Sequence, residues 1–519
     1  MAARGRRRSV RGLAFAVDFP DFHTRRMYVP KPLPPQFTVA RWVFSRALAV
    51  VFFCAFASLL PQVRGLIGAH GIAPAGQFLD RAWNQLGAGA LWEVPTLGWF
   101  GAGDGVLTAL GVAGVLISLL MAAGVAPGAC SLALWALYLS LCSVSRPFLD
   151  FQWDGLLTET ALLAAVALPW RLRPQWEESG PLPRFGRWLL WWLLFRLMLE
   201  SGLVKLASGD PEWRGLTALD FHFATQPLPL WPAWFAHQAP RWMLRGATLI
   251  MFAFELVVPW LILAPRRWRH AGAWALIALQ MAILLTGNYA FFNLLTIALC
   301  ALLFDDAAWP RRWRERVVPG VRWPEPPRPR LALAGAVAAG VVALLSLPPL
   351  LQDVAELARI KLPFAWPRPM AQFRSFNGYG LFAVMTTERP EIIVEGSNDG
   401  VVWQEYAFSW KVGDVAARPR LAAPHQPRLD WQMWFAALYG WEQNPWFQSF
   451  LGRLLEGRPE VLGLLKTNPF PTQPPRYIRS VLYEYHFTKA GEGGAWWRRE
   501  LKGAYGPELA LAPAAGAEE

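Results

Sequence analysis

The sequence predicts a multi-pass α-helical membrane bundle of about nine spans, followed by a compact α+β, β-rich extracytoplasmic domain. Composition is the first observation: 54% of the 519 residues are hydrophobic, 17% are charged, and the mean hydropathy is +0.24. These values are too apolar for an ordinary soluble protein. The second observation is the recurrence of long apolar runs up to about residue 350, and the third is the alternating, turn-rich pattern that replaces them afterwards.

These patterns divide the chain into five parts. They are a basic cytoplasmic N-terminus (1–41), a transmembrane helical domain with outer loops (42–350), a Pro-rich linker (351–370), an extracytoplasmic mixed α/β domain (371–506) and a disordered tail (507–519). The tail is assigned as disordered because it is rich in Ala, Pro and Glu.

Most of the predicted spans approach the roughly twenty residues that a tilted membrane helix needs. They cover residues 42–60, 105–123, 128–145, 155–169, 188–207, 242–263, 271–287, 289–304 and 331–350. Segment 155–169 is short and contains Glu159, so it could instead be half-buried or re-entrant. Its loss would reverse the orientation of everything downstream.

Loop charge tests the span count, because cytoplasmic loops collect Lys and Arg. Residues 351–519 carry 18 basic and 18 acidic side chains, and residues 1–350 carry the remaining 32 and 19. Clusters of Arg fall in the predicted inner loops, whereas the outer loops 61–104, 146–154 and 208–241 are close to neutral. The nine-span count therefore places the C-terminal domain outside. The excess basic charge is attributed to the orientation of the helices in the membrane and not to nucleic-acid binding.

The N-terminus and the cysteines give two further expectations. An Arg-rich segment precedes the first apolar run, which lacks a small-residue cleavage site and is therefore interpreted as a retained anchor. Cys54, Cys130, Cys142 and Cys300 all lie in apolar runs. No disulfide framework and no CxxC pair for thiol exchange are predicted.

The C-terminal domain is expected to mix short strands with short helices. Strands are predicted at 381–386, 391–395, 401–408 and 477–487, and helices at 430–439, 446–455 and 459–466. The sequence Ser397-Asn398-Asp399-Gly400 supplies residues that tolerate positive φ, as a hairpin turn requires.

Ionisable residues inside the fifth predicted span need an explanation, because charges are costly in a membrane. Arg196 and Glu200 are four residues apart and can pair on a helix, while Lys205 points elsewhere and could extend to the interface. Glu159 and Glu255 are candidate partners from other spans. The three interpretations are a structural salt-bridge network, a substrate or proton site, and interfacial anchoring of Lys205.

Two outer loops could also carry chemistry. Asp150 and Asp154 could form a general acid/base pair, although Asp154 is equally suited to cap the next helix. Loop 208–241 is aromatic and Pro-rich, so it could lie in the headgroup layer or bind a polypeptide. Its two histidines, His222 and His237, lack metal-ligand spacing, and no metal site, cofactor or nucleotide-binding motif is predicted.

A set of short stretches, in this order along the chain, resembles the lipase maturation factor family. They are FRLMLESGLVK (195–205), SGDPEWR (208–214), LTAL (216–219), TQPLP (225–229), TGN (286–288), EGSNDGVVW (395–403) and RLDWQMWFAA (428–437). The resemblance runs from about residue 146 to about residue 506, which is more specific than any single motif.

This resemblance implies a multi-pass membrane protein with a luminal or extracytoplasmic C-terminal domain. In animals such proteins reside in the endoplasmic reticulum membrane and help secreted lipases to fold and assemble. The implied partners are membrane lipids and a secreted client, with no nucleic acid. The Ala- and Arg-rich, Lys-poor composition further suggests a bacterial member, which would reside in the inner membrane.

Two classes of function compete on this basis. The favoured one is a non-enzymatic assembly factor whose outer surface holds a folding client. The alternative is an integral-membrane enzyme acting on a lipid or polypeptide at the outer leaflet, distantly similar to the vitamin-K-dependent carboxylase bundle. The client-binding candidates are Trp213, Arg214, His222, Gln226, Trp431 and Trp434. The catalytic candidates are Lys205, Glu200, Arg196, Asp150, Asp154 and Glu159.

Overall fold

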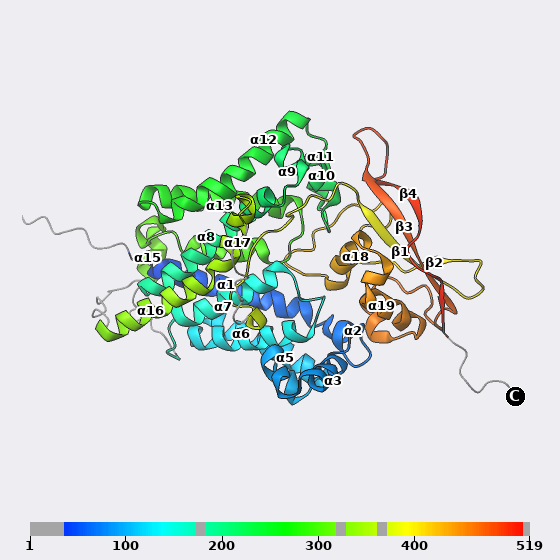
Figure 1. Cartoon of the computed structure of the whole chain (residues 1–519), viewed down its shortest axis with the longest axis horizontal. Helices are drawn as coiled ribbons and strands as arrows, with labels where there is room; N and C mark the ends of the chain where they lie inside the picture. The colour runs from blue at the N-terminus through cyan, green and yellow to red at the C-terminus, as the bar shows by residue number, and fades with distance from the viewer. Residues whose placement is uncertain (1–35, 173–181, 318–328, 361–370, 512–519) are drawn as a thin grey trace, which may run out of the picture. The chain divides into compact units, whose positions relative to one another are not determined.

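The computed structural model describes residues 36–172, 182–317, 329–360 and 371–511. Most of the predicted cytoplasmic N-terminus, half of the predicted linker and residues 512–519 of the predicted tail lie outside these ranges. Within them, the chain forms a bundle of helices followed by a region built on one antiparallel sheet (Figure 1).

Six stretches of helix in the described residues are long and apolar enough to cross a membrane, and each coincides with a predicted span. Four are α1 (Thr38–Leu59), α5 (Asp104–Ala123), α6 (Pro127–Val144) and α13 (Arg266–Thr286). The fifth, Arg241–Leu263, joins α12 (Arg241–Phe252), a π-helical turn η3 (Ala253–Val257) and a 3-10 turn η4 (Val258–Leu263). The sixth, Gly335–Leu357, joins most of α16 (Pro329–Leu345) to α17 (Leu347–Leu357).

The other three predicted spans are also helical but do not meet the same criteria. They are α7 (Gln152–Ala167), α8 (Arg184–Ala207) and α14 (Phe292–Ala301). Helices α7 and α14 are short, and α8 contains three charged side chains in its apolar part. All three are largely buried in the protein, where other helices shield them. The structure therefore confirms a multi-helix membrane bundle, and the count of nine stays a prediction.

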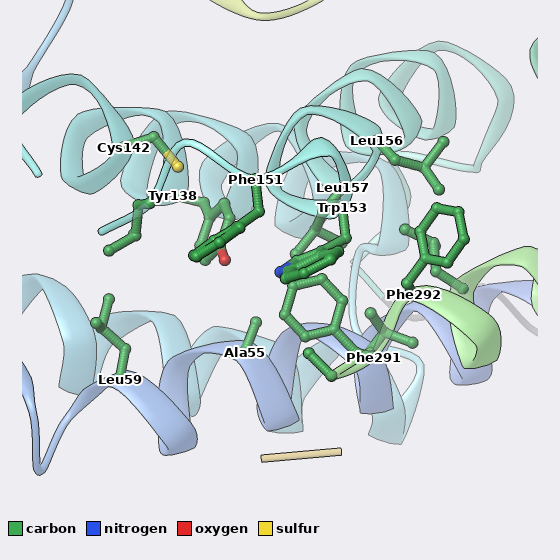
Figure 2. Close-up of a cluster of buried hydrophobic side chains, with 14 of the residues drawn as sticks. Ala55, Leu59, Tyr138, Cys142, Phe151, Trp153, Leu156, Leu157, Phe291 and Phe292 are labelled. Atoms are coloured by element: carbon green, nitrogen blue, oxygen red, sulfur yellow. The ribbon is translucent and has the colours of Figure 1, made fainter. Parts of the chain in front are cut away.

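Aromatic side chains fill the centre of the bundle, where α1, α6 and α7 meet the start of α14 (Figure 2). The rings of Phe151 and Trp153 stack with centroids 4.8 Å apart, and Trp431 meets Trp153 edge-on at 4.8 Å. Tyr138 packs edge-on against Phe56 at 5.3 Å. Such buried aromatic groups contribute large apolar areas and favour these offset geometries.

Short helices occupy both ends of the bundle. At the end predicted to be outside they are α2 (Val63–Ile67), α3 (Ala75–Leu86), η1 (Gly87–Gly89), α4 (Ala90–Glu93), η2 (Leu97–Phe100), α9 (Pro211–Arg214), α10 (Ala218–Thr225) and α11 (Trp231–His237). At the other end they are η5 (Asp306–Ala308) and α15 (Arg311–Val317).

The C-terminal region contains a five-stranded antiparallel sheet in the order β2-β1-β3-β4, with β5 paired to β3. The strands are β1 (Pro390–Ser397), β2 (Gln404–Glu405), β3 (Tyr477–Phe487), β4 (Trp497–Ala504) and β5 (Leu509–Ala510). The helices are η6 (Ala371–Phe373), α18 (Arg428–Leu438), η7 (Trp441–Gln443), α19 (Pro445–Leu455) and α20 (Pro459–Leu462). The predicted strands 391–395 and 477–487 and the predicted helices 430–439 and 446–455 are confirmed, whereas the predicted helix 459–466 covers only Pro459–Leu462. Strand β5 lies inside the stretch predicted as a disordered tail.

Two predictions for this region were wrong in detail. Strand β2 covers only two residues of the predicted 401–408, and β4 was not predicted because its sequence is largely charged and exposed. Residues 381–386 form no strand, because the loop before α10 uses their backbone groups. The indole of Trp213 donates to the carbonyl of Phe382 at 2.8 Å, and the N–H of Met385 donates to Asp210 Oδ2 at 3.0 Å.

The C-terminal region approaches the bundle from the end predicted to be outside, and its segment 374–379 reaches as far as the middle of α8, where Arg196 donates to the carbonyl of Asn377. Gln62, just beyond α1, donates to the carbonyl of Gln426 at 2.9 Å, and Gln432 donates to the carbonyl of Pro147 at 2.8 Å. The opposite end is rich in basic groups, and there Arg266 pairs with Asp305. In Figure 1, α15 lies at the opposite end of the bundle from the sheet, as the predicted alternation of inner and outer loops requires.

The buried Asp430 gives the C-terminal region a pH-dependent stability. Its Oδ1 accepts hydrogen bonds from the backbone N–H groups of Trp410 at 2.7 Å and Lys411 at 2.8 Å. Burial raises the pKa of Asp430 to about 6, whereas an unfolded aspartate titrates near 3.9. The folded state therefore takes up a proton first, and stability rises as pH falls from about 6 to about 4.

We predict that this rise is lost in Asp430→Asn. Thermal unfolding of both proteins at pH 7, 6 and 5 measures the effect. The difference between the wild type and the variant should shift in favour of the wild type as pH falls, because other titrating groups cancel in the comparison. A difference that stays constant over this range would show that Asp430 titrates normally.

Candidate functional site

Three arginine side chains are completely enclosed at the junction between the bundle and the C-terminal region. Arg196 comes from α8, Arg389 from the residue before β1, and Arg428 from the first turn of α18, and none is more than 1% exposed. A buried charge is tolerated only when it is paired and hydrogen-bonded. The partners of these three side chains therefore define how the two parts of the chain fit together.

Arg428 inserts from α18 into the bundle and binds Asp154 with two hydrogen bonds. The distances are 2.7 Å from Nη1 to Oδ2 and 2.9 Å from Nη2 to Oδ1, which is a bidentate ion pair. The hydroxyl of Tyr138 on α6 donates to the same carboxylate at 2.6 Å. Both charged side chains are at most 1% exposed, so each neutralises the other away from water.

Arg196 is held by a carboxylate from another helix and by the chain that follows η6. Its Nη2 pairs with Glu159 on α7, and its Nη1 donates to the carbonyl of Asn377 at 2.9 Å. Glu159 also accepts from the backbone N–H and the side-chain amide of Asn377, both at 3.0 Å. The segment 374–379 thus supplies hydrogen bonds to charges that lie inside the bundle.

Glu200 and Tyr379 extend the same network. The backbone N–H of Tyr379 donates to Glu200 at 2.8 Å, and its hydroxyl donates to Glu159 at 2.8 Å. Arg196 lies 3.9 Å from Glu200, at the limit of an ion pair, so the predicted contact between them is present but secondary to Glu159. These groups close on each other and on the backbone, not on an open cavity.

Arg389 joins the sheet to the loop after α10. Its guanidinium donates to the backbone carbonyls of Ala224 (2.7 Å), Gln226 and Pro227 (2.9 Å), and it pairs with Glu391 on β1 at 2.8 Å. One side chain thereby satisfies the carbonyl of Ala224 in the last turn of α10 and those of Gln226 and Pro227 in the loop that follows.

Lys205 does not extend to the interface but pairs with Glu255 in the π-helical turn η3. Its Nζ lies 3.0 Å and 2.8 Å from the two carboxylate oxygens and 2.9 Å from the carbonyl of Ser201. All three ammonium hydrogens are therefore donated. The pair faces a cavity between α8, α12 and α13, in contrast to the closed network around Arg196.

The structure separates the two loop carboxylates. Asp150 is exposed and pairs with Arg374 at 2.7 Å, whereas Asp154 pairs with Arg428. Helix α7 begins earlier than predicted, so Asp154 lies in its first turn and accepts from the N–H of Phe151 at 3.3 Å. The two groups belong to different ion pairs and are not arranged as a general acid and base.

Most of the residues predicted to bind a client are buried in the interior of the protein. Trp213, Trp431, Trp434 and Gln226 are buried, and His222 is half-buried against Phe382. The indole of Trp434 donates to the carbonyl of Thr225 at 2.9 Å, which ties α18 to α10. Only Arg214 of the six is exposed, so the aromatic members hold the chain together in this structure.

Sequence reasoning missed Arg389 and Arg428 as junction residues. Arg428 begins the stretch RLDWQMWF, and Trp431, three positions later, lies on the same face of a helix, so the pattern is compatible with burial of both. Arg389 follows an acidic residue and precedes a proline, and nothing in its neighbours indicates that it is enclosed.

Fold and junction together define a multi-pass membrane protein whose C-terminal β-sheet region is built into one end of its helix bundle. The model of the lipase maturation factor transmembrane domain matches residues 39–311, and that of the lipase maturation factor C-terminal domain matches residues 375–507. The chain therefore belongs to the lipase maturation factor family.

Vertebrate relatives support the same assignment. Lipase maturation factor 2 of Homo sapiens is 37% identical over 91% of this chain and 82% of its own length. Lipase maturation factor 1 of Bos taurus is 35% identical over 91% of this chain and 89% of its length. No solved structure matches the chain. The bacterial assignment was wrong, because composition was its only basis and the relatives found are eukaryotic.

We predict that Arg428→Met strongly destabilises the protein. The substitution leaves the carboxylate of Asp154 buried without its counter-charge, which costs about 3–5 kcal/mol, a large share of a typical folding free energy. Thermal unfolding in detergent, followed by tryptophan fluorescence, measures the loss.

The matched control is Arg458→Met, which removes a partly exposed ion pair with Glu456 and should cost at most about 1 kcal/mol. Adding Asp154→Asn to Arg428→Met removes the stranded charge and should restore part of the stability. If Arg428→Met unfolds like the wild type, the Arg428–Asp154 pair does not hold the junction.

Proposed function

We propose that this protein is a membrane-anchored maturation factor that assists the folding of secreted proteins, lipases among them, in the lumen of the endoplasmic reticulum. Membership of a family whose relatives are named lipase maturation factors carries this proposal. The junction supports it, because the buried Arg428–Asp154 ion pair and the hydrogen bonds between segment 374–379 and the buried charges of α7 and α8 hold the C-terminal region against the bundle. A client that binds there would meet a preformed surface.

Exposed apolar side chains at this end offer a surface for an unfolded client. Trp231 and Phe235 on α11 and Trp242 and Met243 on α12 are 42%, 55%, 74% and 48% exposed, and we call these four residues the aromatic rim. The rings of Trp231 and Phe235 lie 5.9 Å apart, and Trp242 and Met243 lie at the start of the candidate span Arg241–Leu263, at the end predicted to be outside. Exposed aromatic groups are typical of protein-binding surfaces.

The aromatic rim is continuous with the C-terminal region. The ring of Phe235 lies 6.5 Å from that of Trp496, and the side chain of Gln238 donates to the carbonyl of Thr488 at 3.0 Å. A client on the rim would therefore contact both parts of the protein. This surface replaces the buried tryptophans as the proposed client site, and the exposed Arg214 is kept as a further candidate.

The orientation of the C-terminal region is testable with a glycosylation site. Gly491→Asn with Gly493→Thr creates an acceptor sequence in the exposed loop between β3 and β4. Neither position has an atom within 4 Å of an added Cβ, and asparagine tolerates the positive φ of Gly491. Expressed in animal cells, this variant should acquire an endoglycosidase-sensitive glycan, because glycosylation occurs only in the lumen.

The control variant, Arg312→Asn with Arg314→Thr, places the same acceptor sequence on α15 at the opposite end and should remain unmodified. Modification of the α15 variant alone would show that the C-terminal region is cytoplasmic and would contradict the proposed orientation.

Client binding by the aromatic rim is testable by rescue of a secreted lipase in cells that lack their own lipase maturation factors. The wild-type chain should restore lipase activity per secreted lipase molecule. We predict that Phe235→Ser with Trp242→Ser lowers this rescue by on the order of tenfold, as expected from the loss of two interface anchors.

Trp83→Ser, which removes an exposed tryptophan from α3, is the control and should leave rescue unchanged. The rim variant should also accumulate and unfold like the wild type, since its side chains are exposed. Full rescue by the rim variant would exclude this surface as the client site, and failure of the wild-type chain would contradict the proposed function itself.

A further inference from the structure

A cavity of about 370 Å³ lies between α8, α12, η3 and α13. Its walls are mainly apolar and include Leu197, Met198, Ile250, Met251, Phe254 and Ile283. This volume is within the range of small-molecule sites and much larger than the voids that packed interiors retain. The cavity is therefore large enough to hold a small molecule or part of a lipid.

The cavity opens between two helices that qualify as membrane spans. Ala247 and Ile250 on α12 and Ala278 and Ala282 on α13 line it and are exposed at the surface of the bundle. Helix α13 packs closely on η4 at Gly272, where an added Cβ would lie 2.8 Å from Leu261. The two helices meet at the end of α13 that contains Gly272. The cavity lies beside the part of α13 that contains Ala278 and Ala282. Its opening thus faces hydrocarbon, from which a lipid chain can enter.

The charged groups at the cavity are already neutralised. Lys205 and Glu255 line it, and each of the three hydrogens of the ammonium has an acceptor. A ligand with a phosphate or carboxylate would find no free counter-charge among the described lining residues, and burying an unpaired charge is costly.

Two polar lining residues, His222 and Tyr289, belong to a neutral hydrogen-bonded set that also includes Gln226, which does not itself line the cavity, and His222 Nδ1 has no partner in it. The amide nitrogen of Gln226 donates to the carbonyl of Thr286 at 2.9 Å, so its oxygen accepts from the hydroxyl of Tyr289 at 2.9 Å. The hydroxyl hydrogen of Tyr289 is therefore used in this bond. In the contact between Tyr289 and His222 Nε2, 3.3 Å apart, the imidazole N–H must donate to the hydroxyl oxygen. Burial and the nearby Lys205 lower the pKa of His222 to about 4, so the ring is uncharged at neutral pH.

From this geometry we infer that the cavity binds an uncharged membrane lipid, whose hydrocarbon chain lies between α8, α12 and α13 and whose small polar head lies near His222 and Tyr289. Diacylglycerols and long-chain isoprenoid alcohols share this chemistry. Fatty acids and phospholipids do not, because their head groups are charged. This inference goes beyond the proposed function and does not depend on a client.

Photolabelling of the full chain in phosphatidylcholine nanodiscs tests the inference. The probes are a diazirine diacylglycerol, a diazirine isoprenoid alcohol, a diazirine fatty acid and a diazirine phosphatidylcholine. At least one of the two uncharged probes should label peptides that contain residues 247–254 or 278–286, and an excess of the same lipid without diazirine should displace it. Which of the two labels identifies the lipid class.

The variant Ala278→Phe places a ring at the opening and should reduce this labelling by at least about tenfold. Ala271→Phe is the matched control, because it lies two turns away on the same face of α13 and does not line the cavity. It should be labelled like the wild type.

Labelling that cannot be displaced, equal labelling by all four probes, or undiminished labelling of Ala278→Phe would overturn the inference, since each indicates only bulk lipid around the bundle. The displacement measurement uses the wild type, so it decides the question even if Ala278→Phe does not fold. If the wild-type chain is labelled as expected but does not rescue a secreted lipase, the result contradicts the proposed function and leaves this inference intact.

Discussion

The cost of placing charged side chains inside an apolar bundle is the constraint on which this structure depends. Moving one ion from water into a dry interior costs on the order of 20 kcal/mol in the idealised case, and still several kcal/mol after relaxation. The bundle contains Glu159, Arg196, Glu200 and Asp154, all buried. Their pairing therefore decides whether the bundle can fold.

The C-terminal region supplies much of that pairing. Arg428 neutralises Asp154, and the backbone and side chains of 374–379 form hydrogen bonds with Glu159 and Arg196. In the reverse direction, carbonyls of the bundle loop satisfy the buried Arg389. Burying these charges would cost more free energy in either part alone than in the complete protein. The bundle and the C-terminal region therefore fold as one unit. The Lys205–Glu255 pair differs, because it is complete within the bundle and faces a cavity.

Sequence predicted well what depends on local pattern. Long apolar runs gave the membrane helices, and alternation with turn residues gave β1 and β3, because hydrophobic periodicity reports which face is buried. The family was predicted from its short motifs. Glu159 and Glu255 were correctly considered as partners of the charges in α8, since few other carboxylates lie in apolar spans.

The predictions that failed concern features that depend on contacts distant in sequence. Residues 381–386 have the composition of a strand, but the loop at Asp210 and Trp213 takes their backbone groups. The exposure of Trp431 and Trp434 was misjudged for the same reason, because aromatic residues suit both a binding surface and a junction.

Hydrogen exchange under increasing denaturant tests the central claim that the bundle and the C-terminal region form one cooperative unit. The amides of α7 and α8 and those of β1 and β3 report on the two parts separately within the intact chain. We expect both sets to lose protection at the same denaturant concentration, because opening either part leaves buried charges of the other unpaired. Loss of protection in β1 and β3 while α7 and α8 remain protected would contradict it.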